Sequence, residues 1–139
     1  SPVVGRGTGD SSPAAAPLGA APLPVHALRA AGVAVGLGTD GIRDLWSPYG
    51  TGDLLALTTQ LARLSRFRYD EELVTAARVA TSDAARFVGR DVHDLVVGAP
   101  ADVVLVDAEN VPDAVVRAPR RALVVAGGRV VARDGDVLV

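Results

Sequence analysis

The feature that most constrains the fold is a short apolar run, Val33 to Leu37, that leads into Asp40. A continuous apolar run is typical of a parallel strand that is covered on both faces. A carboxylate inside such a strand would be a buried charge without a partner, at a cost of several kcal/mol. At the carboxyl end of a barrel strand, the same group lies where active sites are built. We therefore predict a buried strand here and assign Asp40 to chemistry.

Around this run, the spacing of apolar residues predicts helices, with proline or short polar residues at their starts. We expect these helices at residues 24–31, 52–66, 70–80 and 82–89. Asp70 is the expected cap of the third helix, and Gly89 ends the fourth. The second helix carries an apolar stripe of Leu54, Leu57, Leu61 and Leu64. The core faces of the third and fourth are expected to be Leu73, Val74, Ala77, Ala84, Phe87 and Val88.

From Leu95 onward the pattern changes to short β-strands. The glycine pair Gly127-Gly128 and the pair Asp134-Gly135 have the composition of two-residue hairpin turns. Strands are expected at residues 102–106, 122–125, 129–133 and 137–139, with a helical turn at 112–117. The chain thus divides into a loop or linker (1–22), an α/β part (23–94) and a β-rich subdomain (95–139).

Composition narrows the class of partner. Hydrophobic residues make up 49% of the 139 residues and charged residues 22%, which is ordinary for a folded domain. The formal net charge of −2 gives no basis for nucleic-acid binding, and no apolar run is long enough to span a membrane. The absence of cysteine excludes disulfides and thiolate metal sites and fits the cytoplasm.

Three segments carry a family resemblance: the run GLGTDGIRDLWSPYGTGDLL from Gly36, the segment Gly98 to Asp107, and Gly127 to Val131. They resemble the cytosine-deaminase-like members of the amidohydrolase superfamily, which are metal-dependent (β/α)8 barrels that hydrolyse C–N bonds of ring substrates. The resemblance covers residues 23–131. It implies that residues 23–94 are the last strand and helices of the barrel, and that residues 95–139 are the C-terminal part of a small β-sandwich.

Length limits what this chain does alone. A complete barrel of this type needs about 250 residues, and a catalytic zinc site needs about three protein ligands. The histidine ligands implied by the resemblance have no counterparts here, because His26 and His93 are the only histidines. A Zn or Fe ion is therefore expected in the intact enzyme and not in this chain alone. The expected partner is the missing N-terminal part of the barrel or a second copy of this chain.

The resemblance implies that Asp40 lies beside the metal as one of its ligands and shuttles a proton between water and the substrate nitrogen. The alternative is that Asp40 caps a turn, since Asp-Gly is a common turn pair. Trp46 and Tyr49 are expected to form an aromatic wall for a flat ring, unless Trp46 packs the loop onto the barrel rim. Asp44 is a further candidate for substrate binding, and Asp44 and Arg43 have a turn cap or a salt bridge as alternatives.

The remaining candidates have plainer interpretations. His26 and His93 are expected at the surface or in packing, and Arg120-Arg121 as a solvated strand edge. Leu45 and Gly41 depart from the family pattern, which commonly has proline and a second acid at these positions. Cytosine is therefore one candidate substrate, and a triazine or cyclic amide is another. A third interpretation is a non-catalytic remnant or partner-binding module of the same fold.

Overall fold

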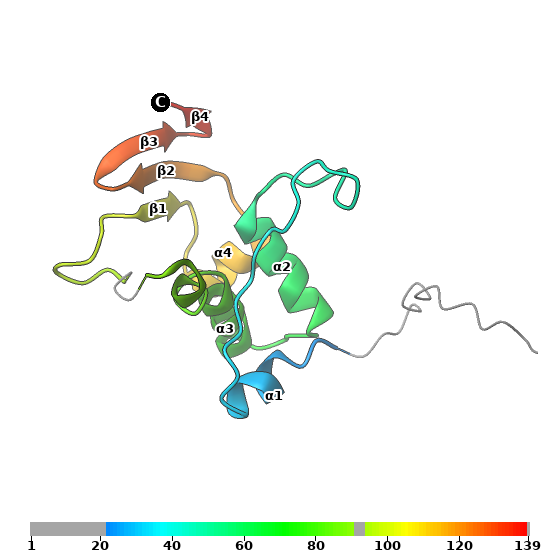
Figure 1. Cartoon of the computed structure of the whole chain (residues 1–139). Coiled ribbons are helices and arrows are strands. Elements are labelled where there is room, and N and C mark those ends of the chain that lie inside the picture. The colour runs from blue at the N-terminus through cyan, green and yellow to red at the C-terminus, as the bar shows by residue number, and fades with distance from the viewer. Residues whose placement is uncertain (1–21, 91–93, 139) are drawn as a thin grey trace, which may run out of the picture.

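The computed structural model describes residues 22–90 and 94–138, and Figure 1 shows a group of helices followed by a sheet. The predicted linker at 1–22 lies outside the described residues, apart from Pro22. The helices are α1 (Val25–Ala30), α2 (Leu54–Leu64), α3 (Asp70–Ala80), the 3-10 helix η1 (Ala85–Val88) and α4 (Val111–Arg117). The strands are β1 (Val103–Val106), β2 (Arg121–Ala126), β3 (Arg129–Arg133) and β4 (Asp136–Val137).

Side chains at the helix starts satisfy backbone N–H groups that have no partner within the helix. Asn110 caps α4, where its Oδ1 accepts a hydrogen bond of 2.9 Å from the N–H of Asp113. The prediction that Asp70 caps α3 was wrong, because α3 already begins at Asp70 and its N-cap residue is Tyr69. Glu72 reaches back from the first turn and accepts from the N–H of Tyr69 at 3.0 Å.

The core lies among helices α1 to α4. α4 packs against both α2 and α3, although it comes from the β-rich region of the sequence (Figure 1). The hydroxyl of Thr59 on α2 donates a 2.5 Å hydrogen bond to the carbonyl of Val115 on α4. Val79 and Val115 are each 1% exposed and are the largest apolar side chains that are fully buried among the described residues. The buried cluster consists of Val25, Leu61, Ala62, Ala76, Val79 and Val115.

Two packing predictions were wrong. Leu64, the last residue of the predicted stripe, is 62% exposed, because α2 ends there and only Leu61 and Ala62 of this turn face the core. Phe87 and Val88 are 61% and 74% exposed rather than buried. They lie on η1, a single tight 3-10 turn that ends at Gly89 in a left-handed conformation and buries only Ala85.

The predicted strand at Val33 to Leu37 has no ladder partner within the described residues. The segment follows α1 without regular secondary structure, and Figure 1 shows it as a trace passing α3. Val35 and Leu37 pack against the core cluster, and the N–H of Leu37 donates to the carbonyl of Val79 at 2.9 Å. A strand requires neighbours that accept and donate backbone hydrogen bonds on its edges, so this part of the prediction was wrong for the described chain.

The strands form one antiparallel sheet in the order β1-β2-β3-β4. Both predicted hairpin turns are present: Gly127 and Gly128 have φ of 55° and 77°, and Asp134 and Gly135 have 51° and 89°. Positive φ at both central residues is the requirement of a tight hairpin turn that matches strand twist. The described residues contain this single sheet. Within the same residues, no helix has the length and apolarity to cross a bilayer.

Candidate functional site

Asp40 lies three residues after the segment Val33 to Leu37 and is exposed. Its φ of 53° is in the left-handed region, which non-glycine residues rarely adopt and which aspartate tolerates better than most. Such conformations persist where the surrounding chain enforces them, and they cluster at functional sites. The backbone therefore turns at the residue that the sequence assigns to chemistry.

The next turn is built on Asp44. Its Oδ1 accepts hydrogen bonds from the N–H groups of Trp46, at 2.9 Å, and Ser47, at 2.7 Å. This is the aspartate turn that the sequence allowed as an alternative role for Asp44. The carboxylate of Asp44 is folded back over Gly41, where a Cβ atom would overlap it. A side chain at position 41, including that of a second acid, would therefore displace the Asp44 carboxylate from this turn.

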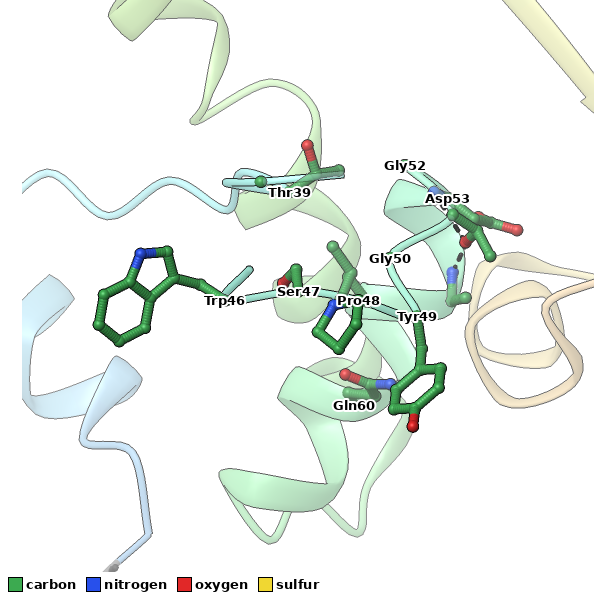
Figure 2. Close-up of a pocket in the computed structure, with 13 residues that line it drawn as sticks. Thr39, Trp46, Ser47, Pro48, Tyr49, Gly50, Gly52, Asp53 and Gln60 are labelled. Atoms are coloured by element: carbon green, nitrogen blue, oxygen red, sulfur yellow. Dashed lines mark hydrogen bonds between the residues drawn. The ribbon is translucent and has the colours of Figure 1, made fainter. Parts of the chain in front are cut away.

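A pocket of about 340 Å³ lies between the aromatic loop, which we define as residues 41–52, and helix α2. Trp46 and Tyr49 both line this pocket, together with Gln60 of α2. Thr39 and Gly41 also line it, whereas Asp40 between them does not. Figure 2 shows the indole of Trp46 directed away from Tyr49 and Gln60. The side chains are largely uncovered, since Trp46 is 89% and Tyr49 is 92% exposed.

Asp53 forms the end of the pocket that adjoins α2, a role that sequence reasoning missed. Its Oδ1 accepts hydrogen bonds of 3.0 Å from the N–H groups of Leu55 and Ala56. The guanidinium of Arg121 pairs with the same carboxylate, so Arg121 is not the solvated edge that was predicted. Burial raises the pKa of Asp53, but the hydrogen bond from Arg121 and those from the backbone outweigh burial and lower it overall.

No three histidine or carboxylate side chains come together as a metal site within residues 22–90 and 94–138. The Nε2 atom of His26 lies 3.6 Å from an oxygen of Glu72, and its ring centroid is 4.8 Å from that of Phe67. These contacts give His26 the packing role expected from the sequence. His93 lies outside the described residues.

Comparison with known proteins shows the family of this chain. Residues 8–132 match the Amidohydrolase family. The chain belongs to this family. N-isopropylammelide isopropylaminohydrolase from Burkholderia multivorans ATCC 17616 is 48% identical and superposes with a TM-score of 0.78, over 82% of this chain and 29% of that one. For 5-methylcytosine deaminase from Klebsiella pneumoniae, liganded with 5-fluorocytosine, the identity is 28%, the TM-score 0.71 and the coverage 78% and 27%.

Curated relatives include two enzymes named for heterocyclic compounds. N-isopropylammelide isopropyl amidohydrolase of Pseudomonas sp. (strain ADP) is 29% identical over 84% of this chain. Pterin deaminase of Rhizobium rhizogenes (strain K84 / ATCC BAA-868) is 34% identical over 79%. The chain spans 29% and 25% of the lengths of these relatives. The family resemblance seen in the sequence is thus confirmed, and it extends to deaminases and amidohydrolases.

Proposed function

We propose that these residues belong to an enzyme that hydrolyses a C–N bond of a nitrogen heterocycle, with Asp40 as its proton carrier. The observation that carries the proposal is the position of Asp40, in a left-handed turn between two residues that line the pocket. The family and the relatives named for heterocyclic compounds support this reaction class.

In this reaction Asp40 works in two steps. As water attacks the ring carbon, the carboxylate accepts one of its protons, so that the oxygen forms its bond as hydroxide. The proton then passes from the carboxyl group to the departing nitrogen, and the C–N bond breaks to release ammonia or an amine. Asp40 is a carboxylate again at the end of the cycle, as a general acid–base group must be.

The described residues do not make a metal site on their own, because a catalytic site needs about three protein ligands and no such cluster is present among them. Asp40 is the one ligand that we assign to this chain. A Zn or Fe ion would need further ligands from the remainder of an intact enzyme, and no step above depends on it.

The substrate ring is a choice between two classes. Cytosine-like deamination was the first interpretation of the sequence. The second candidate is an alkylamino-substituted triazine. It is favoured by the 48% identity with N-isopropylammelide isopropylaminohydrolase, against 28% with 5-methylcytosine deaminase. Either ring is flat and would gain about 0.5–1.5 kcal/mol by stacking on an aromatic side chain such as Trp46 or Tyr49.

The test is amine release by an intact enzyme that contains these residues, offered cytosine, pterin and N-isopropylammelide in parallel. Release of ammonia from cytosine or pterin supports the deaminase, and release of isopropylamine supports the triazine substrate. If no compound releases an amine while the enzyme is folded and loaded with Zn or Fe, the proposed reaction is wrong and the remnant interpretation takes its place.

We further propose that the residues act with a partner, either the remainder of the barrel or a second copy. Val33 is 48% exposed in a segment that pairs with no strand within the described chain, and an apolar strand edge without a partner is a template for association. Sedimentation of the purified chain tests this, and a well-dispersed monomer with a cooperative melt would contradict it. The cytoplasm remains the predicted compartment.

A further inference from the structure

Asp53 joins the aromatic loop to helix α2. It directly follows the aromatic loop, and it caps helix α2 through Leu55 and Ala56. It also lines the pocket that Trp46 and Tyr49 line. A contact that fixes the carboxylate of Asp53 therefore fixes both the end of the loop and the start of the helix.

That contact is made by Arg121, which is 68 residues away along the chain. Its Nη1 atom donates to Oδ2 of Asp53 at 3.0 Å, and its Nη2 atom donates to Oδ1. The same Nη1 also donates to the carbonyl of Pro119 at 3.3 Å, which holds the guanidinium against the chain just before β2. A two-point contact of this kind fixes orientation as well as distance, which a lysine ammonium does not.

The Asp53–Arg121 pair is more buried than an ordinary surface ion pair. The side chains of Arg121 and Asp53 are 25% and 30% exposed, so screening by solvent is reduced. By contrast, Arg117 pairs with Asp113 four residues earlier on the same helix, and its side chain is 48% exposed. Arg117 bonds to Asp113 and to the carbonyl of Asp107, and neither partner belongs to the aromatic loop or to α2. Arg117 is therefore the control.

We propose that Arg121 is a positioning residue: from strand β2 it fixes Asp53, and through Asp53 it fixes the aromatic loop that walls the pocket. The sheet thereby sets the geometry of a site formed by another part of the chain. The kinetic consequence of this inference rests on the proposed function, whereas its structural consequence does not.

Hydrogen exchange of the full chain, read by mass spectrometry over residues 41–57, tests the structural consequence. Arg121→Gln removes the pair, and Asp53→Asn removes its charge but keeps a side chain that caps helices equally well. Both variants should exchange at least about fivefold faster than wild type across the loop, as expected for losing a partly buried charged hydrogen bond. Arg117→Gln should leave this segment unchanged. Arg121→Lys should restore less than half of the protection.

Equal exchange in Arg121→Gln and Arg117→Gln would overturn the inference, as would full recovery in Arg121→Lys. If Arg121→Gln instead unfolds the chain, Asp53→Asn decides, since the cap is retained. In an intact enzyme Arg121→Gln should raise KM about fivefold or more and change kcat less, because the loop walls the pocket and Asp40 lies outside its lining. An inactive wild type would count against the proposed function alone, and the exchange result would still decide the role of Arg121.

Discussion

The role of α4 as a core element is tested by two neighbouring valines on the same helix. Val115 is 1% exposed and lies between α2 and α3, whereas Val116 is 58% exposed. Val115→Ala removes two methyl groups from the core, which costs about 1.6 kcal/mol of transfer free energy at ~0.8 kcal/mol each. The cavity left behind adds about 1 kcal/mol if the surroundings relax only in part. Alanine returns about 0.5 kcal/mol through its higher helix propensity.

The net expectation for Val115→Ala is a loss of about 2 kcal/mol in the free energy of unfolding. Val116→Ala makes the same chemical change with the same gain in propensity, and should stay within about 0.5 kcal/mol of wild type. Urea unfolding of the full chain, at one protein concentration for all variants, measures both values. If the two variants lose the same stability, α4 is not part of the core and the packing described here is wrong.

Two further predictions concern the ion pair on α4 and the aromatic loop. The hydrogen bond from Arg117 lowers the pKa of Asp113 to about 2 from its ordinary 3.8, so the pair should stabilise α4 fully above that ordinary value and progressively less as pH falls through about 2. A carboxyl titration by NMR should give this midpoint, and Arg117→Gln should return it toward the ordinary value; an unchanged midpoint would contradict the assignment. In an intact enzyme, Trp46→Ala should raise KM by about 2- to 12-fold with little change in kcat, the worth of one aromatic contact. A fall in kcat alone would place Trp46 in the chemistry rather than in the pocket wall.

Local patterns predicted most helices and turns of this chain. The apolar spacing and polar starts placed α2 and α3 within a few residues, and Gly127-Gly128 forms the hairpin that its composition requires. These features depend on neighbours within a few positions, which the sequence displays directly. The errors at Val33, Leu64 and Phe87 arose because burial depends on which surface lies opposite, and spacing alone does not show that surface.

The residues of the candidate site were likewise predicted only in part. The position of Asp40 after an apolar run, and the two aromatic residues of the loop, were visible in the sequence, and the substrate-binding roles of Asp44, Trp46 and Tyr49 stay predictions. Asp53 carried a usable signal, since an aspartate before an apolar helical run is a typical cap. Its partner Arg121 carried none, because two charges 68 residues apart meet only in the folded chain, where the first residue of β2 contacts the residue before α2. Gln60 was likewise missed, since an exposed glutamine on a helix has no distinguishing pattern.

The central claim is that Asp40 carries the proton for C–N hydrolysis. The most direct measurement is the kcat of amine release by an intact enzyme with Asp40→Asn, compared with wild type on the better of the tested substrates. Asparagine preserves the size of the side chain and tolerates the left-handed backbone of this residue, so the fold and the aromatic loop should be retained. We predict a fall in kcat of about 10²- to 10⁴-fold, the worth of a positioned acid–base group. Near-normal turnover in a folded Asp40→Asn enzyme would remove Asp40 from the mechanism and contradict the account.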